Sequence, residues 1–460
     1  MSVDIKHDDY EDKYDNWEKC RDFIEGSGAV KAKGDEYLPK LDKQDDKEFE
    51  NYVDRALFYG ASGRTHLALL GSIFRKDPML EGLESVDERD ISMKGLSLTD
   101  FARKVTDEVL AVGRYGVLVE YSEEEGKPFL VGYTAENIRN WRIERINGKM
   151  VVTLVVLEEQ EEEEGDSEFS TDKVTVYRAL RLINGIYTVE EYRASTGDDA
   201  TGAPTLRSST VPVRNGAALN EIPFVFFGPE NLQPQISKPP LMDLIEVNNS
   251  HYMSSADLEN GRHLVGLPTP VFLGMGIEDE VVLGSQNAIK SDTPGGSAFF
   301  LEFTGSGLTT LENALREKEH LMSVMGAKLI EPPRAGVEAA ETARIRQAGD
   351  ASLLAMIGKV VSEGMSEVMR TFVWWSGLEP ADTLRVELNN DFIDFRMEPN
   401  ELTAFMSAYL SGGISYETLF YNLKKGEIIK KDRSMEEEQD DIDTGDLPGA
   451  ETRNTDGNTG

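Results

Sequence analysis

The sequence predicts an α+β protein with a helical opening, a β-rich middle and a second half made of long helices. Three observations predict this class. Apolar residues recur at helical spacing before Gly113. Alternating and β-branched runs separated by turn residues follow as far as Phe227. Helical spacing then returns after Pro239-Pro240 and continues almost to the end of the chain.

The opening should contain several helices. A polar helix is expected over 9–26, and another starts near Asp45. Apolar residues recur at helical spacing in this second helix: Phe49, Tyr52, Val53, Ala56, Leu57 and Tyr59. An apolar pattern resumes over 65–74. Ser97, with Asp100 three residues later, has the pattern of a helix N-cap and predicts a further helix that ends at Gly113.

The β-rich middle should contain strands at 115–121, 149–157, 173–182, 186–192 and 222–227. The dipeptide Asn184-Gly185 predicts a tight hairpin turn between the third and fourth of these strands. Two loops are expected. The run EEQEEEEGDSE at 158–168 is read as a solvated loop because it is a block of like charges, and 198–205 as a second loose loop.

The second half should begin with a long helix after Pro239-Pro240 that reaches about Leu264, where prolines stop it. The remaining elements follow in order: a mixed region at 271–306, a helix at 308–326, a proline-bearing loop at 328–337, a long helix at 338–375, a short strand at 385–388 and two or three small helices within 398–431. The end of the long helix, Trp374-Trp375, is expected to pack on the β-rich region. The tail 433–460 is acidic and poor in apolar residues, which predicts disorder.

Composition narrows the function. The chain has 460 residues with 48 basic and 84 acidic side chains, a formal charge of −36. Such a chain is not an ordinary DNA binder, because affinity for the phosphate backbone comes mainly from Lys and Arg. Two interpretations stay open: solvated acidic faces on a soluble protein, or a surface that touches DNA without holding it. The single cysteine, Cys20, allows no disulfide within the chain and fits a reducing cytosol. The acidic N-terminus is unlike a signal peptide, and no apolar run is long enough for a membrane span.

Motifs for catalysis are missing from the sequence. The five histidines do not pair at metal-ligand spacing: His7, His66, His251, His263 and His320. There is no GxxxxGK[ST] phosphate loop, no GxGxxG fingerprint and no GxSxG elbow. The cluster Gly305-Ser306-Gly307 fits a plain helix start better than an anion site. The sequence therefore predicts no enzyme activity, no cofactor and no metal.

Several motifs occur in a characteristic order along the chain. They are YVDRALFYG at 52–60 running on to Pro78, PLMDL at 240–244, HYMSSAD at 251–257, LPTP at 267–270, ETA at 341–343 and GISYET at 413–418. In this order they resemble bacteriophage portal proteins, and in particular a portal family catalogued as a domain of unknown function, the DUF4055 group. The loops near 158–170 and 196–210 and the tail after 433 match no motif of that family.

The resemblance implies a portal fold and a division of the chain into named parts. These are an N-terminal helical extension (1–44), a wing of helices and a β-rich domain (45–238), stem helices (239–265 and 308–327) flanking a small α/β clip (266–307), a tunnel loop (328–337), a long wing helix with a return strand (338–396), crown helices (397–432) and an acidic tail (433–460).

The resemblance also implies a role in the virion. About twelve copies would form a homo-oligomeric ring at one capsid vertex. Double-stranded DNA would pass through this ring without sequence specificity during packaging and ejection. Expected partners are the terminase large subunit, head-completion or tail adaptor proteins, and the major capsid and scaffold proteins, with no membrane involved. The protein would be made in the cytoplasm of the host bacterium. The alternative is another capsid-associated protein, such as a head-completion or scaffold-like component.

Two sets of site residues follow from the resemblance. The tunnel loop would face DNA through Lys328, Glu331, Pro332, Pro333 and Arg334. The alternative for Lys328 and Arg334 is solvation or pairing with the neighbouring glutamates. The clip would face partners through Glu278, Asp279, Glu280 and Lys290. Its short strands are expected to pair between subunits, and a simple β-insert within one chain is the alternative.

Overall fold

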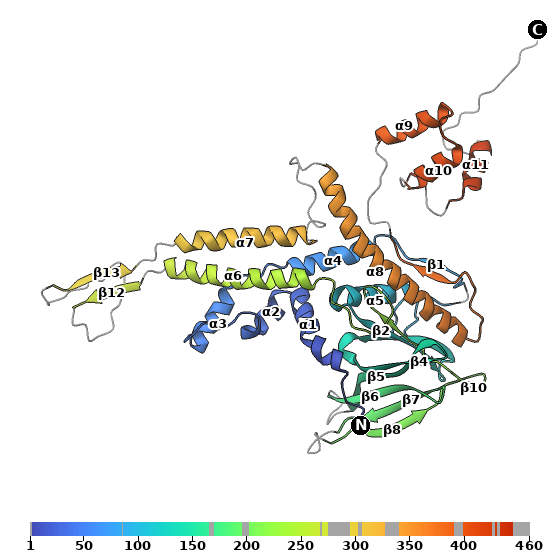
Figure 1. Cartoon of the computed structure of the whole chain (residues 1–460), viewed down its shortest axis with the longest axis horizontal. Helices are drawn as coiled ribbons and strands as arrows, with labels where there is room; N and C mark the ends of the chain where they lie inside the picture. Colours follow the sequence, from blue (N-terminus) through green and yellow to red (C-terminus); the bar gives the residue numbers. More distant parts are fainter. Residues whose placement is uncertain are drawn as a thin grey trace, which may run out of the picture. The chain divides into compact units, whose positions relative to one another are not determined.

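The computed structural model describes residues 2–84, 86–164, 170–195, 202–266, 269–274, 295–301, 306–326, 340–390, 399–425, 428–429 and 433–444. The chain divides into two compact units, Met1–Asn390 and Asp391–Gly460, and each is described by itself. Helices and sheets are both abundant in the first unit (Figure 1), so the predicted α+β class is confirmed.

The first unit opens with helices, as predicted. They are α1 (Asp8–Glu25), α2 (Ser27–Ala32), the 3-10 turn η1 (Gly34–Glu36), α3 (Asp46–Arg55), α4 (Ala61–Ile73) and α5 (Leu98–Val112). Ser97 caps α5 as predicted, since its Oγ accepts from the Asp100 backbone N at 3.1 Å, and Gly113 ends the helix with φ of 75°. The helix expected through Tyr59 instead ends at Arg55, and Leu57 lies exposed in the following loop.

One face of α1 is part of the core, although its sequence is polar overall. Tyr10, Trp17, Cys20 and Phe23 are completely buried and lie on one side of the helix. This side packs against α4, α5 and α6. The Cys20 Sγ lies 3.7 Å from the Met242 Sδ, and burial raises the pKa of the thiol to about 12. Cys20 is therefore a protonated packing residue.

A three-stranded antiparallel sheet with the order β11-β2-β3 forms the centre of the first unit. Its strands are β2 (Tyr115–Ser122), β3 (Lys127–Thr134) and β11 (Phe224–Phe227). The long helix α8 (Ala340–Trp375) packs along all three strands. The approach is close at Gly364, where a Cβ would lie 2.4 Å from the Phe227 ring. Glycine at this position therefore sets the distance between helix and sheet.

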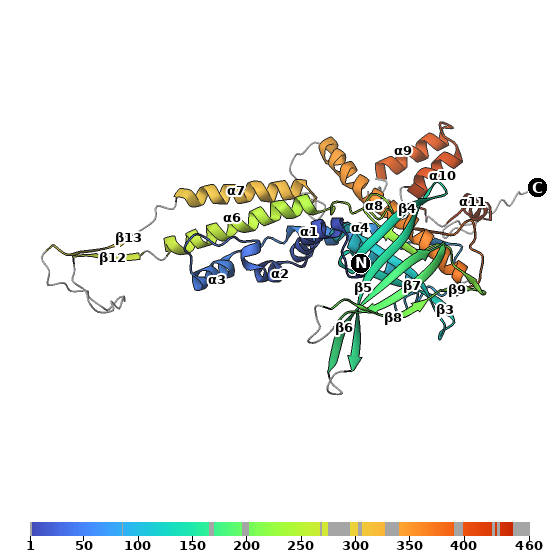
Figure 2. The same ribbon diagram turned by 60° about the horizontal axis from the view of Figure 1, so that its bottom comes forward.

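A five-stranded antiparallel meander lies beside the central sheet (Figure 2). Its strands are β4 (Ile138–Ile146), β5 (Lys149–Glu164), β6 (Thr171–Ile183), β7 (Ile186–Arg193) and β8 (Thr205–Thr210), with the turn η2 (Ala135–Asn137) before β4 and the small hairpin β9 (Val213–Arg214) and β10 (Ala217–Ala218) after β8. The predicted turn at Asn184-Gly185 is confirmed, because both residues have positive φ between β6 and β7. Strands β3, β4 and β8 were not predicted.

The acidic run is strand where the structure describes it, so the predicted loop is wrong for residues 158–164. These residues continue β5 and pair with β6. Alternate glutamates meet arginines from more distant strands of the sheet: Glu161 lies 2.6 Å from Arg207 of β8, and Glu163 lies 2.7 Å from Arg193 of β7. The strand period of two separates adjacent glutamates onto opposite faces, and these cations reduce the repulsion that the sequence suggested.

The C-terminal half of α8 is held in place by a short sheet and by hydroxyl groups. Strand β14 (Arg385–Glu387) pairs with β1 (Met79–Glu81). On α8, the Oγ of Ser366 accepts from the Val386 backbone N and that of Ser362 from the Leu388 backbone N, both at 2.9 Å. Trp374 stacks under the Arg214 guanidinium at 4.2 Å, which confirms the expected contact between this helix end and the β-rich region.

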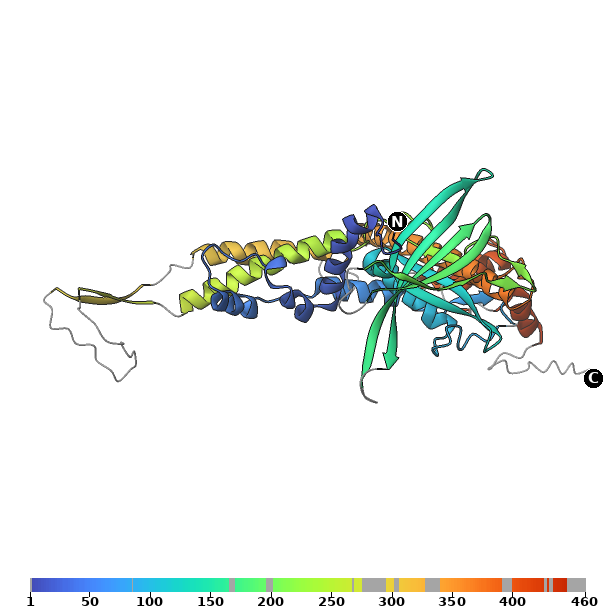
Figure 3. The ribbon, with the colours of Figure 1, turned by 90° about the horizontal axis from the view of Figure 1, so that it is seen from below.

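Two long helices and a hairpin extend from the rest of the first unit, which is here called the body. They are α6 (Met242–Gly266), α7 (Ser306–Val324), β12 (Thr269–Leu273) and β13 (Ser297–Leu301). Helices α6 and α7 lie side by side in all three views, and β12 pairs with β13 beyond their outer ends (Figures 1, 2 and 3). The helices match the two predicted at 240–264 and 308–326. None of the described helices is long and apolar enough to cross a membrane.

The second unit contains small helices: α9 (Pro399–Leu410), α10 (Tyr416–Lys425) and α11 (Met435–Thr444). The first two were predicted. Helix α11 corrects the prediction of a disordered tail for the part that the structure describes. Ser434 and Glu437 form its N-terminal cap, because each side chain accepts from the other's backbone N–H, at 3.1 and 2.9 Å. Acidic residues in its first turn also favour the helix through its dipole.

Candidate functional site

The residues proposed from the sequence lie outside the described residues. This holds for Lys328, Glu331, Pro332, Pro333 and Arg334 of the tunnel loop, and for Glu278, Asp279, Glu280 and Lys290 of the clip. The structure does describe the elements that flank both segments. Helices α6 and α7, here called the strut, and the hairpin β12–β13 are therefore the candidate site.

The strut is anchored to the body by contacts of α6 that run from its inner end to beyond its middle. Asp257 accepts a 2.5 Å hydrogen bond from the Tyr52 hydroxyl of α3. Asn248 is completely buried; its side chain accepts from the Ser62 hydroxyl at 2.9 Å and donates to the Tyr59 carbonyl at 2.8 Å. The outer end of α6 is exposed, from Arg262 to Leu264. The strut is thus held at one end and leaves the other end accessible.

Helices α6 and α7 meet along a seam that is polar over much of its length. The Lys318 ammonium donates to the Ser250 carbonyl at 2.8 Å and to the Ser254 hydroxyl at 2.6 Å. Arg262 reaches Glu312 at 2.9 Å near the outer end. Among the described side chains of α7, Met322 alone is fully buried. A seam of this kind gives little of the apolar burial that stabilises a protein core.

His251 adds a titratable group to the seam. Its Nε2 lies 3.4 Å from a carboxylate oxygen of Glu319, and its Nδ1 has no hydrogen-bond partner among the described residues. Burial lowers the pKa of His251 below its ordinary value, and the Glu319 carboxylate opposes this shift. Burial also lowers the pKa of Lys318. The seam therefore contains groups whose charge is costly to bury.

The hairpin β12–β13 is apolar on both faces. Val271 lies opposite Phe299 on one face, and Pro270 lies opposite Phe300 on the other. Every residue of β13 is exposed, with Phe299 at 46% and Phe300 at 56%. Soluble proteins rarely leave such a surface uncovered. An exposed two-faced apolar hairpin is consequently the clearest sign of an interaction site in the described part of the chain.

The pairing within the hairpin bears on one sequence expectation. The clip strands were expected to pair between subunits, with a simple β-insert inside one chain as the alternative. Strand β12 pairs with β13 of the same chain, and pairing between subunits stays a prediction. This sheet has two strands, so the outer edge of each has no strand neighbour among the described residues. Such edges can still accept a further strand. Any helical part of the predicted α/β clip falls at residues outside the described ones.

Sequence reasoning missed the polar seam, although a signal for it exists. The inward stripe of α7 follows Leu308, Leu311, Leu315 and Met322, and Lys318 occupies the position between the last two. A lysine in an apolar stripe indicates a buried polar contact or a partner carboxylate. The described residues contain no cluster of His, Cys, Asp or Glu that could hold a metal ion.

Comparison with protein families gives a match over the strut. The family described as "Domain of unknown function (DUF4055)" matches residues 240–376, which include α6, β12, β13, α7 and α8. Of the motifs that suggested this group, those at 240–244, 251–257, 267–270 and 341–343 lie inside the match. Those at 52–78 and 413–418 lie outside it. No curated protein matches the chain.

Solved structures of gene transfer agent particles are similar to the chain at 12% sequence identity. The neck of a native particle with C12 symmetry has a TM-score of 0.37 and covers 79% of this chain and 89% of that one. The neck of an empty particle with C6 symmetry has a TM-score of 0.35 and covers 85% and 96%, and a native virion has 0.33 and covers 84% and 93%. Likenesses of this strength assign no role to the chain.

Proposed function

We propose that the chain is a portal subunit, one copy of a ring at a capsid vertex of a phage-like particle through which double-stranded DNA enters and leaves. In this role the strut and hairpin lie between copies. Terminase and the head-completion or tail adaptor proteins would dock on the ring, and major capsid and scaffold proteins would surround it. The protein would act in the virion and would have no enzymatic activity of its own.

The observation that carries this proposal is the hairpin. Covering an exposed Leu or Phe side chain stabilises an assembly by roughly 1.5–3 kcal/mol. Leu273, Phe299, Phe300 and Leu301 are all about half exposed. A hairpin with apolar groups on both faces requires a partner on each side, and a ring of identical subunits gives every copy two neighbours. A partner that covers one face would leave the other in water.

The family match supports the same assignment, because it falls on the strut, the hairpin and the long helix rather than on the β-rich body. The resemblance of the motifs to portal proteins adds to it. The formal charge of −36 also suits a channel wall, since carboxylates repel DNA phosphates and prevent tight binding. The sequence lacks a phosphate loop, so the work of packaging would come from a separate motor.

Sedimentation velocity of the purified protein tests the proposal. The wild-type chain should sediment as a large homo-oligomer. Phe299→Ser combined with Phe300→Ser should shift it to small species, because the variant removes one large apolar group from each face of the hairpin.

A matched control removes exposed apolar groups from the body instead. Leu57→Ser combined with Leu67→Ser changes side chains that are 61% and 65% exposed, and it should leave the oligomer intact. A wild-type chain that remains monomeric at high concentration contradicts the proposal. So does a hairpin variant that assembles as well as the control.

A further inference from the structure

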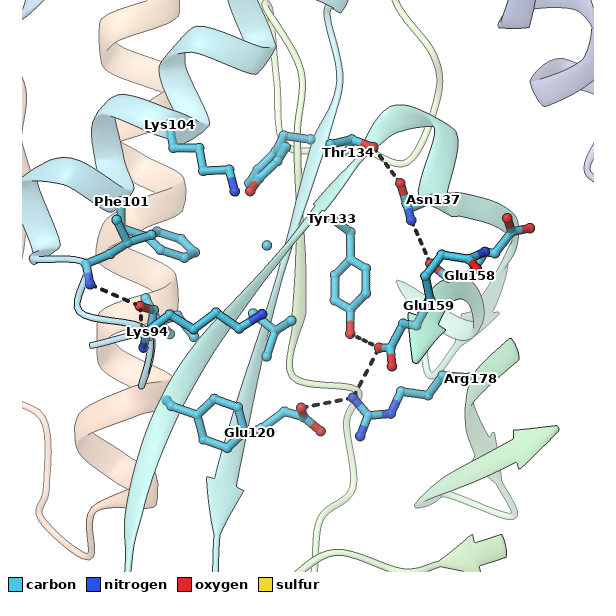
Figure 4. A pocket seen from close by; sticks show the side chains of 18 residues that line it. Lys94, Phe101, Lys104, Glu120, Tyr133, Thr134, Asn137, Glu158, Glu159 and Arg178 are labelled. Atoms are coloured by element: carbon cyan, nitrogen blue, oxygen red, sulfur yellow. Dashed lines mark hydrogen bonds and ion pairs between the residues drawn. The ribbon is translucent and has the colours of Figure 1, made fainter. Parts of the chain in front are cut away.

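A cavity of about 420 Å³ lies in the body, away from the strut (Figure 4). Its walls come from the loop before α5, from α5 itself, from the central sheet and from strands β5 and β6. Strand β3 is an edge of the central sheet and forms part of the lining. Small-molecule sites in proteins have volumes of about 300–1,000 Å³. The cavity is therefore large enough for a ligand.

One wall of the cavity is a fixed polar network. The Tyr133 hydroxyl donates to a carboxylate oxygen of Glu159 at 2.5 Å. The Arg178 guanidinium reaches Glu120 at 2.9 Å and the same Glu159 at 3.4 Å (Figure 4). Burial raises the pKa of Tyr133, so its hydroxyl stays protonated. This wall presents carboxylates as hydrogen-bond acceptors in fixed positions.

The opposite side of the cavity carries two lysines. Lys94 from the loop and Lys104 from α5 extend into the cavity (Figure 4). Both residues are exposed at its rim, and neither ammonium has an ion pair or hydrogen bond within the described ranges. Arg178, by contrast, is matched by carboxylates on its own wall. The cavity thus has a cationic rim facing an anionic wall.

The Tyr115 hydroxyl makes the cavity chemically incomplete. Tyr115 is completely buried, it lines the cavity, and its hydroxyl has no hydrogen-bond partner in the part of the chain that is described. A buried hydroxyl without a partner costs about 1–3 kcal/mol. Native proteins rarely keep such a group unless a ligand or an ordered water completes it. Because this hydroxyl has no exposed surface in the structure, a ligand in the cavity reaches it only when the Tyr115 side chain shifts.

We propose that this cavity binds a small phosphate monoester whose organic part donates hydrogen bonds, the class that includes nucleoside monophosphates. The Lys94 and Lys104 ammoniums hold the dianionic phosphate, and the Tyr115 hydroxyl donates to it. The organic part packs against the partly exposed Phe129 ring and directs its N–H or O–H donors to the wall of Glu120 and Glu159. This binding site goes beyond the portal role and does not depend on it.

Isothermal titration calorimetry of the full chain tests the site, with adenosine 5′-monophosphate as the probe. The monophosphate should bind more tightly than adenosine or inorganic phosphate, because each of these lacks half of the complementary groups. Lys94→Gln with Lys104→Gln should weaken binding by about tenfold or more. Lys149→Gln with Lys173→Gln removes the same charge from exposed positions on β5 and β6 and should leave binding unchanged.

Tyr115→Phe separates a ligand-binding role of the hydroxyl from a purely structural one. Losing the unpartnered hydroxyl should raise the melting temperature of the ligand-free protein in either case, but only a ligand-binding hydroxyl also makes binding of the monophosphate weaken severalfold. Three results overturn the proposal: no binding of the monophosphate at millimolar concentration, equal affinity for inorganic phosphate (an adventitious ion only), or unchanged affinity in Tyr115→Phe. The last result decides the question even if the double lysine variant fails to fold.

Discussion

The body and the strut of the first unit are built in opposite ways. In the body, large aromatic side chains such as Tyr10, Trp17 and Phe23 are completely buried. In the strut, Met322 is the one fully buried side chain among those described on α7, polar contacts of Lys318 join α7 to α6 beside it, and the hairpin exposes apolar groups on both faces. The difference teaches that the body contains the interactions for its own stability, whereas the strut and hairpin, under the proposed function, reach their full stability only when other copies cover them.

The largest expected effect comes from the body. Phe23→Ala should destabilise the protein by about 3–5 kcal/mol, because the ring is completely buried and packs edge-on against Tyr37 and Phe58 at centroid distances of 5.2 and 5.5 Å. Chemical denaturation checks this value. A loss below about 1 kcal/mol would mean that α1 is not part of the core.

An intermediate effect is expected in the seam of the strut. Lys318→Ala should cost about 1–3 kcal/mol, since it removes two hydrogen bonds to α6 and leaves Ser254 without a partner. Lys359→Ala is the matched control on α8, where the lysine is exposed and pairs weakly with Glu363 at 3.8 Å. Hydrogen exchange should report faster opening of α7 in the first variant alone. Equal exchange in both variants would show that the polar seam does not hold the helices together.

The smallest effect should be a pH dependence centred on His251. Because burial lowers its pKa in the folded state, the unfolded chain binds the proton more readily. The contribution of His251 is therefore present above pH 6.5 and is lost as the pH falls. The groups around it are Tyr59 from the loop before α4, with Lys318 and Glu319 from α7.

Unfolding midpoints of the wild type and of His251→Gln at pH 7.5 and 5.5 measure this contribution. The wild type should lose more stability than the variant on acidification. If both proteins respond equally, protonation of His251 has no part in holding the strut.

The sequence predicted the elements whose signals are local. Ser97 with Asp100 gave the start of α5, Asn184-Gly185 gave a hairpin, and the prolines before α6 gave the start of the strut. It failed where the deciding partner is distant along the chain. The glutamates of β5 can lie in a strand because Arg193 and Arg207, from strands later in the chain, pair with them. Arg139 of β4 likewise lies 3.2 Å from Glu158 of β5.

The candidate site was predicted in outline only. The two helices follow from periodicity and prolines, whereas their pairing around an insert was implied by the resemblance to portal proteins, and in the structure they lie side by side. The pairing of β12 with β13 inside one chain was the alternative that the sequence left open, and its register could not be predicted, because register depends on which edges meet in space. Lys318 could have been noticed as a lysine in an apolar stripe, but its acceptors lie on α6. The tunnel-loop and clip residues stay predictions.

Electron microscopy of the purified wild-type protein in negative stain tests the central claim most directly. If neighbouring copies cover the strut and hairpin, the particles will be closed rings with a central hole, viewed down one symmetry axis. The contradicting result is that the wild-type protein shows only solitary particles and that the hairpin variant at the same concentration looks no different. These surfaces would then not join subunits.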